Sequence, residues 1–248
     1  TVTVEGGAIF KTGDPDGFNG GSGITSTSIR SDIETITLST NSTVEYSGAD
    51  QKITLFNTPY YTNLKISGTG LKTLEHPNQI FVNENLLVEK SKLFLNVSDI
   101  ITINKSVNII DSVGEIELKN NAQLVQIDDA SANTGTKFSM QRNYTAGQYD
   151  YVYWGAPTAL FPVASLPTSH KYQWNTTFDN TNGTQGNWVS PTTEMTPGIG
   201  YIARASNGSS TPILNSFSFT GKPNNGLITV PISRGNYNGD GITTGLDY

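Results

Sequence analysis

Short apolar segments recur at a nearly constant spacing between residues 32 and 127. From Ile80 onward they begin about seven residues apart, and the dipeptides Asn63-Leu64, Asn85-Leu86 and Asn108-Ile109 follow one another at offsets of 22 and 23 residues. A coil of three short strands, about 22 residues in all, is the repeat of a parallel β-solenoid. One such segment cannot bury its apolar side alone, whereas stacked coils share a continuous core. The spacing therefore predicts a solenoid.

An antiparallel sandwich with tight hairpins is the alternative for the same segments. It is disfavoured because the hairpin dipeptides Asn-Gly and Asp-Gly are absent between Ile33 and Leu124. The expected strands lie in the segments IETITLS at Ile33, TVEYS at Thr43, KITLF at Lys52, NLKIS at Asn63, IFVN at Ile80, NLLVEK at Asn85, LFLN at Leu93, IITIN at Ile100, VNIID at Val107, EIELK at Glu115 and QLVQI at Gln123.

The pattern changes after Thr136, where the spacing loosens and aromatic residues and prolines accumulate. The segments YDYVYW, HKYQWN, GYIARA, NSFSFTG and LITVPI are joined by Thr-, Asn- and Gly-rich loops and predict an antiparallel sandwich with an aromatic core. The polar run DDASANTGT, residues 128–136, marks the boundary. The sequence thus predicts an all-β protein, with a solenoid region over 1–130 and a sandwich over 137–248.

Two turns have specific sequence signals. Pro197-Gly198 predicts a type II turn, because proline fixes φ at the first central position and glycine accepts the positive φ at the second. Asn225-Gly226 predicts a type I′ hairpin between the segment 217–219 and the segment 227–230.

The composition excludes several functions. The chain has a net charge of −6 and its 15 basic residues form no stripe, which argues against nucleic acid as a partner. It has no cysteine and only two histidines, which excludes thiol chemistry and the usual zinc sites. No apolar run reaches the ~20 residues of a membrane helix. Because Thr1 is not an initiator methionine, we expect a piece of a larger parent protein.

Aromatic residues form the first candidate site. Tyr149, Tyr151 and Tyr153 alternate and therefore share one face of a strand, while Val152 and Trp154 share the other. The three tyrosines, together with Trp174, would suit the stacking of sugar rings if they were exposed. The alternative, which the pattern favours, places the tyrosines in the sandwich interior with their hydroxyls at its rim.

Two oxygen-rich loops are candidate calcium sites. The segment from Asn236 to Asp247 matches the spacing of a calcium loop, with ligands at Asn236, Asn238, Asp240 and Asp247 and a glycine at the bend. A flexible Asn/Gly loop explains the same letters. The second loop offers Asp14, Asp16 and Asn19, for which Asx turns are an equal explanation.

Signatures of catalysis are sparse. The chain has no Gly-x-Ser-x-Gly, His-Glu-x-x-His or phosphate-binding glycine motif. Glu115 and Glu117 share a strand face, as paired carboxylates would, but Lys119 follows on the same face and is placed to pair with Glu117. We therefore expect no enzyme. The alternative functions are a carbohydrate-binding module or a β-helix enzyme that acts on polysaccharides.

The second half resembles a module of large secreted surface proteins of Bacteroidota, which are exported by the type IX secretion system. The resemblance rests on YDYVYWGAP, HKYQWN, NWVSPTTEMTPGIGYIARA and FTGKPNNGLITVP in this order, and GTGLKTL at Gly68 is similar to the coils of the same proteins. Gly155-Ala156 stands where that family commonly has a serine pair, and no sorting domain is present.

The resemblance implies a secreted, adhesin-like module at the bacterial cell surface, without catalytic residues. The roles that accompany such proteins are adhesion, gliding motility and a place in a filament or an export complex. Its partners would be other parts of the parent protein, surface glycans or the secretion machinery. The triplet Asp111-Ser112-Val113 resembles the O-glycan attachment signal of secreted Bacteroidota proteins and marks Ser112 as a candidate O-glycosylation site.

Overall fold

The computed structural model describes residues 1–20, 26–56, 58–76, 79–110, 112–179, 185–206 and 208–231. These residues form a nearly all-β protein, in which the helical structure is one 3-10 turn at Val163–Ser165. The chain divides into two compact units. Of the described residues, the first comprises those within 1–142 and 218–226, and the second comprises those within 143–217 and 227–231.

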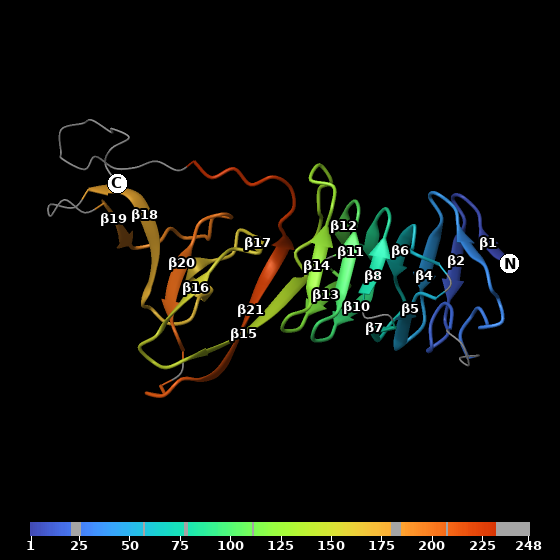
Figure 1. Ribbon diagram of the computed structural model, residues 1–248, viewed down its shortest axis with the longest axis horizontal. Helices are drawn as coiled ribbons and strands as arrows, with labels where there is room; N and C mark the ends of the chain where they lie inside the picture. Colours follow the sequence, from blue (N-terminus) through green and yellow to red (C-terminus); the bar gives the residue numbers. More distant parts are fainter. Residues whose placement is uncertain are drawn as a thin grey trace. The chain divides into compact units, whose positions relative to one another are not determined.

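The first unit is a parallel β-solenoid, in which successive strands of one face stack on one another (Figure 1). One face consists of β2 (Ile9–Thr12), β4 (Thr43–Tyr46), β6 (Asn63–Ile66), β9 (Leu86–Val88) and β12 (Val107–Ile109). A second consists of β5 (Gln51–Thr54), β7 (Leu71–His76), β10 (Ser91–Leu95), β13 (Gly114–Leu118) and the start of β15 (Phe138–Ala146). A third contains β8 (Gln79–Val82), β11 (Ile100–Ile103) and β14 (Gln123–Gln126). β1 (Val2–Val4) pairs with β3 (Ile36–Leu38).

The strand register confirms the predicted repeat. Leu64 pairs with Leu86 and Leu86 with Val107, offsets of 22 and 21 residues. The expected alignment of Asn85-Leu86 with Asn108-Ile109 is wrong by two residues, because Asn108 pairs with Leu87. Ser106 takes the position of the asparagine in that coil, and its hydroxyl donates to Asn85 Oδ1 at 2.7 Å.

Strand alternation explains the core of the solenoid. Inward positions such as Leu64, Leu86, Leu93 and Ile101 are at most 1% exposed, whereas the residues between them face solvent. Each coil supplies only two or three apolar side chains per strand. Stacking therefore removes from water an apolar surface that no single coil could cover, and this burial holds the first unit together.

Polar side chains also link neighbouring coils. Asn63 Oδ1 accepts from the backbone N–H and the side-chain amide of Asn85, both at 3.1 Å, and Asn63 Nδ2 donates to the carbonyl of Ser42 at 3.1 Å. Further along the stack, the backbone N–H of Val107 donates to Asn133 Oδ1 at 2.9 Å. These bonds satisfy buried backbone groups where the chain turns from one face to the next.

Charges alternate along the solvent side of the second face. Lys92 Nζ lies 2.9 Å from Glu115 and 2.7 Å from Glu117, and Lys119 Nζ lies 2.6 Å from Glu117. The predicted pairing of Glu117 with Lys119 is thereby confirmed. Lys119 and Lys92 hold the pKa of Glu117 below its ordinary value of 4.5.

The lowered pKa of Glu117 makes the stability of the solenoid depend on acid. Above the ordinary pKa the carboxylate is ionised in both states, so its ion pairs stabilise the fold, and this contribution is lost as the pH falls through the lower pKa of the folded state. The pairs are partly exposed, so we expect less than about 1 kcal/mol. Calorimetric melting between about pH 5 and pH 3 should show a smaller loss of Tm in Glu117→Gln than in the unchanged protein. If Tm fell equally with pH in the variant and in the unchanged protein, the ion pairs of Glu117 would not be the source of the acid sensitivity.

The second unit contains a four-stranded antiparallel sheet in the order β16 (Tyr151–Trp154), β20 (Tyr201–Arg204), β18 (Lys171–Asp179) and β19 (Gln185–Val189). Its inner side packs against the later part of β15 and the first part of β21 (Ile213–Pro223), which pairs with β17 (Thr158–Ala159). The ring of Trp154 lies 5.2 Å from that of Tyr144 and 5.1 Å from that of Phe217. Aromatic rings therefore fill the space between two layers, as predicted.

Three details differ from the sequence-based expectation. Residues 137–142 and 218–226 belong to the first unit, because the start of β15 continues the parallel ladder beyond β13. The segment 227–231 is not a strand, so Asn225-Gly226 does not close a hairpin there. Instead, Asn225 Nδ2 donates to the carbonyls of Asp128 and Ser131 at 2.9 and 2.7 Å, and this tertiary contact replaces the local turn. The type II turn at Pro197-Gly198 is confirmed, with a φ of 85° at Gly198 and a hydrogen bond of 3.1 Å from Ile199 N–H to Thr196 O.

Candidate functional site

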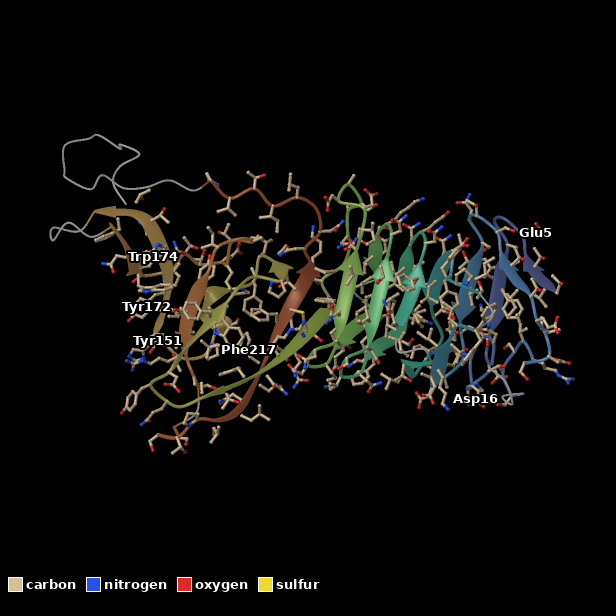
Figure 2. The ribbon with its side chains drawn as sticks, viewed as in Figure 1. Glu5, Asp16, Tyr151, Tyr172, Trp174 and Phe217 are labelled. Atoms are coloured by element: carbon tan, nitrogen blue, oxygen red, sulfur yellow. The ribbon has the colours of Figure 1, made fainter. Side chains whose placement is uncertain are left out.

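The outer side of the four-stranded sheet carries a group of aromatic side chains. Alternation along β16, β18 and β19 directs them away from the second unit's core (Figure 2). We call this group the outer aromatic face; it consists of Tyr151, Tyr153, Tyr172, Trp174 and Trp188. Figure 2 shows Tyr151, Tyr172 and Trp174 in a row on this side, with Phe217 on the other.

The prediction that Tyr149, Tyr151 and Tyr153 lie in the interior of the sandwich is wrong. Tyr149, Tyr151 and Tyr153 are 69%, 37% and 76% exposed, whereas Trp154 on the opposite face is 8% exposed. The opposite side is the inner one because it meets the aromatic residues of β15 and β21, and Trp154 fills that interface. Trp174 is also exposed, at 43%. The four residues named as candidate sugar contacts therefore all reach solvent.

The rings of the outer aromatic face touch one another across the strands. Ring centroids lie 6.2 Å apart for Tyr151 and Tyr172, 6.3 Å for Tyr153 and Trp188, and 5.2 Å for Trp174 and Trp188. Beneath them, Ile202 of β20 is only 6% exposed although it points outward. Mutual packing of the rings thus fixes their orientation before any ligand arrives, which lowers the entropy cost of binding.

The indole of Trp174 packs against the backbone at Gly186, where no larger residue would leave room for it. Gly186 on the neighbouring strand has a φ of 73°, and a Cβ there would come within 2.3 Å of the Trp174 ring. The indole therefore rests directly on the backbone of β19. The sequence pattern did not single out Gly186, Tyr172 or Trp188, because their relation to Trp174 arises from strand pairing; the pair of facing residues Trp174 and Trp188 is a property of the register.

A cationic side chain borders the same face. Arg204 lies opposite Tyr151 on β20, and the carbon of its guanidinium is 5.3 Å from the ring centroid of Tyr151 and 5.6 Å from that of Tyr149. Both distances fall within the range of a cation–π contact.

An open depression of about 340 Å³ adjoins Trp174. Hydroxyl and amide groups line much of it, among them those of Gln173, Asn175, Thr176 and Thr192. Gln173 pairs with Tyr201, which is 1% exposed, so by strand alternation most of this depression lies on the side of β18 opposite the ring of Trp174 and is not part of the outer aromatic face.

The other candidate residues lie elsewhere. Ser112 is exposed in the turn between β12 and β13, beside a depression of about 370 Å³ that Lys92 and Lys137 also line. Ser112 is therefore accessible to a modifying enzyme, and its O-glycosylation stays a prediction. The candidate calcium ligands Asn236, Asn238, Asp240 and Asp247 lie outside the described residues.

In the second candidate calcium loop, the structure shows an Asx turn, which was the alternative to a calcium site. Asp14 Oδ1 accepts from the backbone N–H of Asp16 at 3.0 Å, which is an Asx turn, and Asp16 pairs with Lys52 at 3.4 Å. Asn19 is 1% exposed, and its amide bonds both backbone groups of Phe56. The three side chains are engaged with protein groups and do not converge. Within the described ranges, no group of three or more His, Cys, Asp or Glu residues is arranged to hold a metal ion.

No helix among the described residues has the length and hydropathy to cross a membrane.

Comparison with known proteins identifies a family without a described activity. Neither the curated proteins nor the solved structures include a match to this chain. A family model described as "Domain of unknown function (DUF8693)" matches residues 38–247, which include most of the coils and the outer aromatic face. The chain therefore belongs to the DUF8693 family.

Proposed function

We propose that this chain is a non-enzymatic adhesive module of a large secreted bacterial surface protein, which contacts glycans through the outer aromatic face. The observation that carries the proposal is the exposure of aromatic rings that pack against one another on one side of the four-stranded sheet, with Trp174 43% and Tyr153 76% exposed. Exposed rings whose orientation is already fixed are suited to stack on the apolar C–H face of a sugar ring.

The solenoid supports a structural role in the same module. Its coils are held by a continuous apolar core and by side-chain bonds between coils, an arrangement that extends by repetition. The resemblance to secreted surface proteins of Bacteroidota is the ground for a location at the cell surface and for a larger parent protein as the partner. The carboxylates that would suggest a hydrolase are held by lysines, and the pKa of Glu117 is lowered rather than raised as a general acid requires.

Glycan binding by the outer aromatic face is testable with matched aromatic variants. We expect Trp174→Ala to weaken binding of a polysaccharide about tenfold or more, because an aromatic contact is worth roughly 1 kcal/mol or more beyond the area it buries. Affinity electrophoresis of the whole chain in gels containing a panel of polysaccharides provides the measurement.

Phe81→Ala is the control for this experiment. Phe81 is an aromatic residue of β8 in the solenoid with nearly the same exposure, 44%, and lies outside the outer aromatic face. Its removal should leave retardation unchanged. Equal effects of the two substitutions, or no retardation by any polysaccharide, would refute the proposal, and release of reducing ends from a polymer would refute its non-enzymatic part.

A further inference from the structure

Arg204 is a rigidly held cation at the edge of the outer aromatic face. It belongs to β20, an inner strand of the four-stranded sheet, so its backbone is fixed on both sides by β16 and β18. The rings of Tyr149 and Tyr151 lie against its guanidinium. Because the side chain is already restrained, little conformational entropy is lost when a ligand binds it.

The guanidinium has no carboxylate partner among the residues that the structure describes. Within that part of the chain, no Asp or Glu oxygen lies within 4 Å of its nitrogens, and Arg204 Nε is buried without a hydrogen-bond acceptor. Asp150, which directly precedes the strand partner Tyr151 of Arg204, uses its carboxylate to accept from the N–H of Gly147 at 2.8 Å. In contrast, Arg30 in the first unit lies 3.3 Å from Asp32.

The chemistry of a planar guanidinium indicates which ligand groups would bind at Arg204. The N–H groups of a guanidinium form paired, charge-assisted hydrogen bonds with a carboxylate or a sulfate. Because Nε of Arg204 is buried, such a group would meet the two terminal nitrogens. The adjacent rings of Tyr151 and Tyr172 offer an apolar surface at the same place. A ligand that satisfies both must join an anionic group to a sugar ring.

We infer that the outer aromatic face recognises an anionic saccharide, whose carboxylate or sulfate group binds Arg204 while its sugar rings lie on the neighbouring aromatic side chains. This inference rests on the proposed glycan-binding function and narrows its ligand class. The net charge of the chain is −6, so general attraction of polyanions does not explain such binding; it requires the local cation.

Matched polymer pairs test this assignment on the whole chain by isothermal titration calorimetry. Polygalacturonate and its fully methyl-esterified form share a sugar backbone and differ in charge, and dextran sulfate and dextran form a second pair. Poly-glutamate carries carboxylates without sugar rings. We expect at least about tenfold tighter binding to the charged member of one pair than to its neutral partner, with weaker binding at higher salt. Tighter binding to polygalacturonate identifies the anion as a carboxylate, and tighter binding to dextran sulfate identifies it as a sulfate.

Variants of Arg204 connect that preference to the site. Arg204→Gln should remove the preference for the charged polymer, and Arg204→Lys should restore only part of it, because lysine keeps the charge but not the paired donors. Arg30→Gln removes the same charge from the solenoid and should have no effect. Circular dichroism of each variant shows whether its fold is retained.

Each result separates this inference from the proposed function. Equal binding of charged and neutral polymers that Trp174→Ala abolishes would overturn the anionic assignment and leave glycan binding in place. Binding of poly-glutamate as tight as that of the charged polysaccharide would also overturn it, since the rings would then contribute nothing. Absence of binding to any of the polymers would overturn the inference, and the polysaccharide panel described above then decides whether glycan binding survives.

Discussion

Lys72→Met should destabilise the solenoid by about 3 kcal/mol, far more than the loss of an ordinary surface lysine. Lys72 is fully buried, and its ammonium group donates to the carbonyls of Gly48 and Thr69, at 3.1 and 2.6 Å, and to that of Ala49. It thereby joins the turns of two successive coils. Methionine has a similar volume but no donor, so the carbonyls of Ala49 and Thr69 would lose this partner, and that of Gly48 would keep only the N–H of Thr69 at 3.0 Å.

The free energy of unfolding of this variant can be measured by urea titration followed by far-ultraviolet circular dichroism. Lys52→Met is the matched control, because Lys52 forms ion pairs with Asp16 and Glu75 that are all well exposed, and its loss should cost less than about 1 kcal/mol. Similar losses in the two variants would contradict the role assigned to Lys72. Burial lowers the pKa of Lys72, and Asp50 offsets part of that effect.

Leu86→Ala should cost about 2–5 kcal/mol, because it opens a cavity in the middle of the coil stack. Leu86 is 0% exposed, and it pairs with Leu64 in one neighbouring coil and with Val107 in the other. Close packing on both sides restricts collapse around the missing atoms, so the transfer and cavity terms add.

Leu87→Ala controls for residue type and position in the chain. Leu87 is the next residue of β9 but points outward and is only half-buried, so we expect a loss below about 1 kcal/mol. Urea titration of the two variants gives the comparison. A larger loss at Leu87 than at Leu86 would mean that the assignment of inward and outward positions is wrong.

The sequence predicted the solenoid because its signal is repeated and local. Apolar residues alternate within each segment and segments recur every 21 to 23 residues, as the pairs Leu64 with Leu86 and Lys92 with Glu115 reflect. Lys72 could not be predicted, since it occupies an inward position where alternation calls for an apolar residue. Only the turn carbonyls of two coils, distant in sequence, make its burial favourable.

The candidate site was only partly predictable for a similar reason. Alternation placed Tyr149, Tyr151 and Tyr153 on one side of a strand and Trp154 on the other, but both sides were aromatic enough to be the inner one. The choice depends on which side meets β15 and β21, and that is a tertiary fact. The packing of Trp174 against Gly186 and the position of Arg204 beside Tyr151 likewise follow from strand register, which the segments do not encode individually.

Hydroxyl-radical footprinting with and without a saturating polysaccharide tests most directly whether the outer aromatic face binds glycans. Mass spectrometry resolves the oxidation of single aromatic residues. Tyr153 and Trp174 should become protected when ligand is present, whereas Tyr60 and Phe81, exposed aromatic residues of the solenoid, should be oxidised as before. Protection confined to the solenoid, or unchanged oxidation of Tyr153 and Trp174 at saturation, would contradict the account.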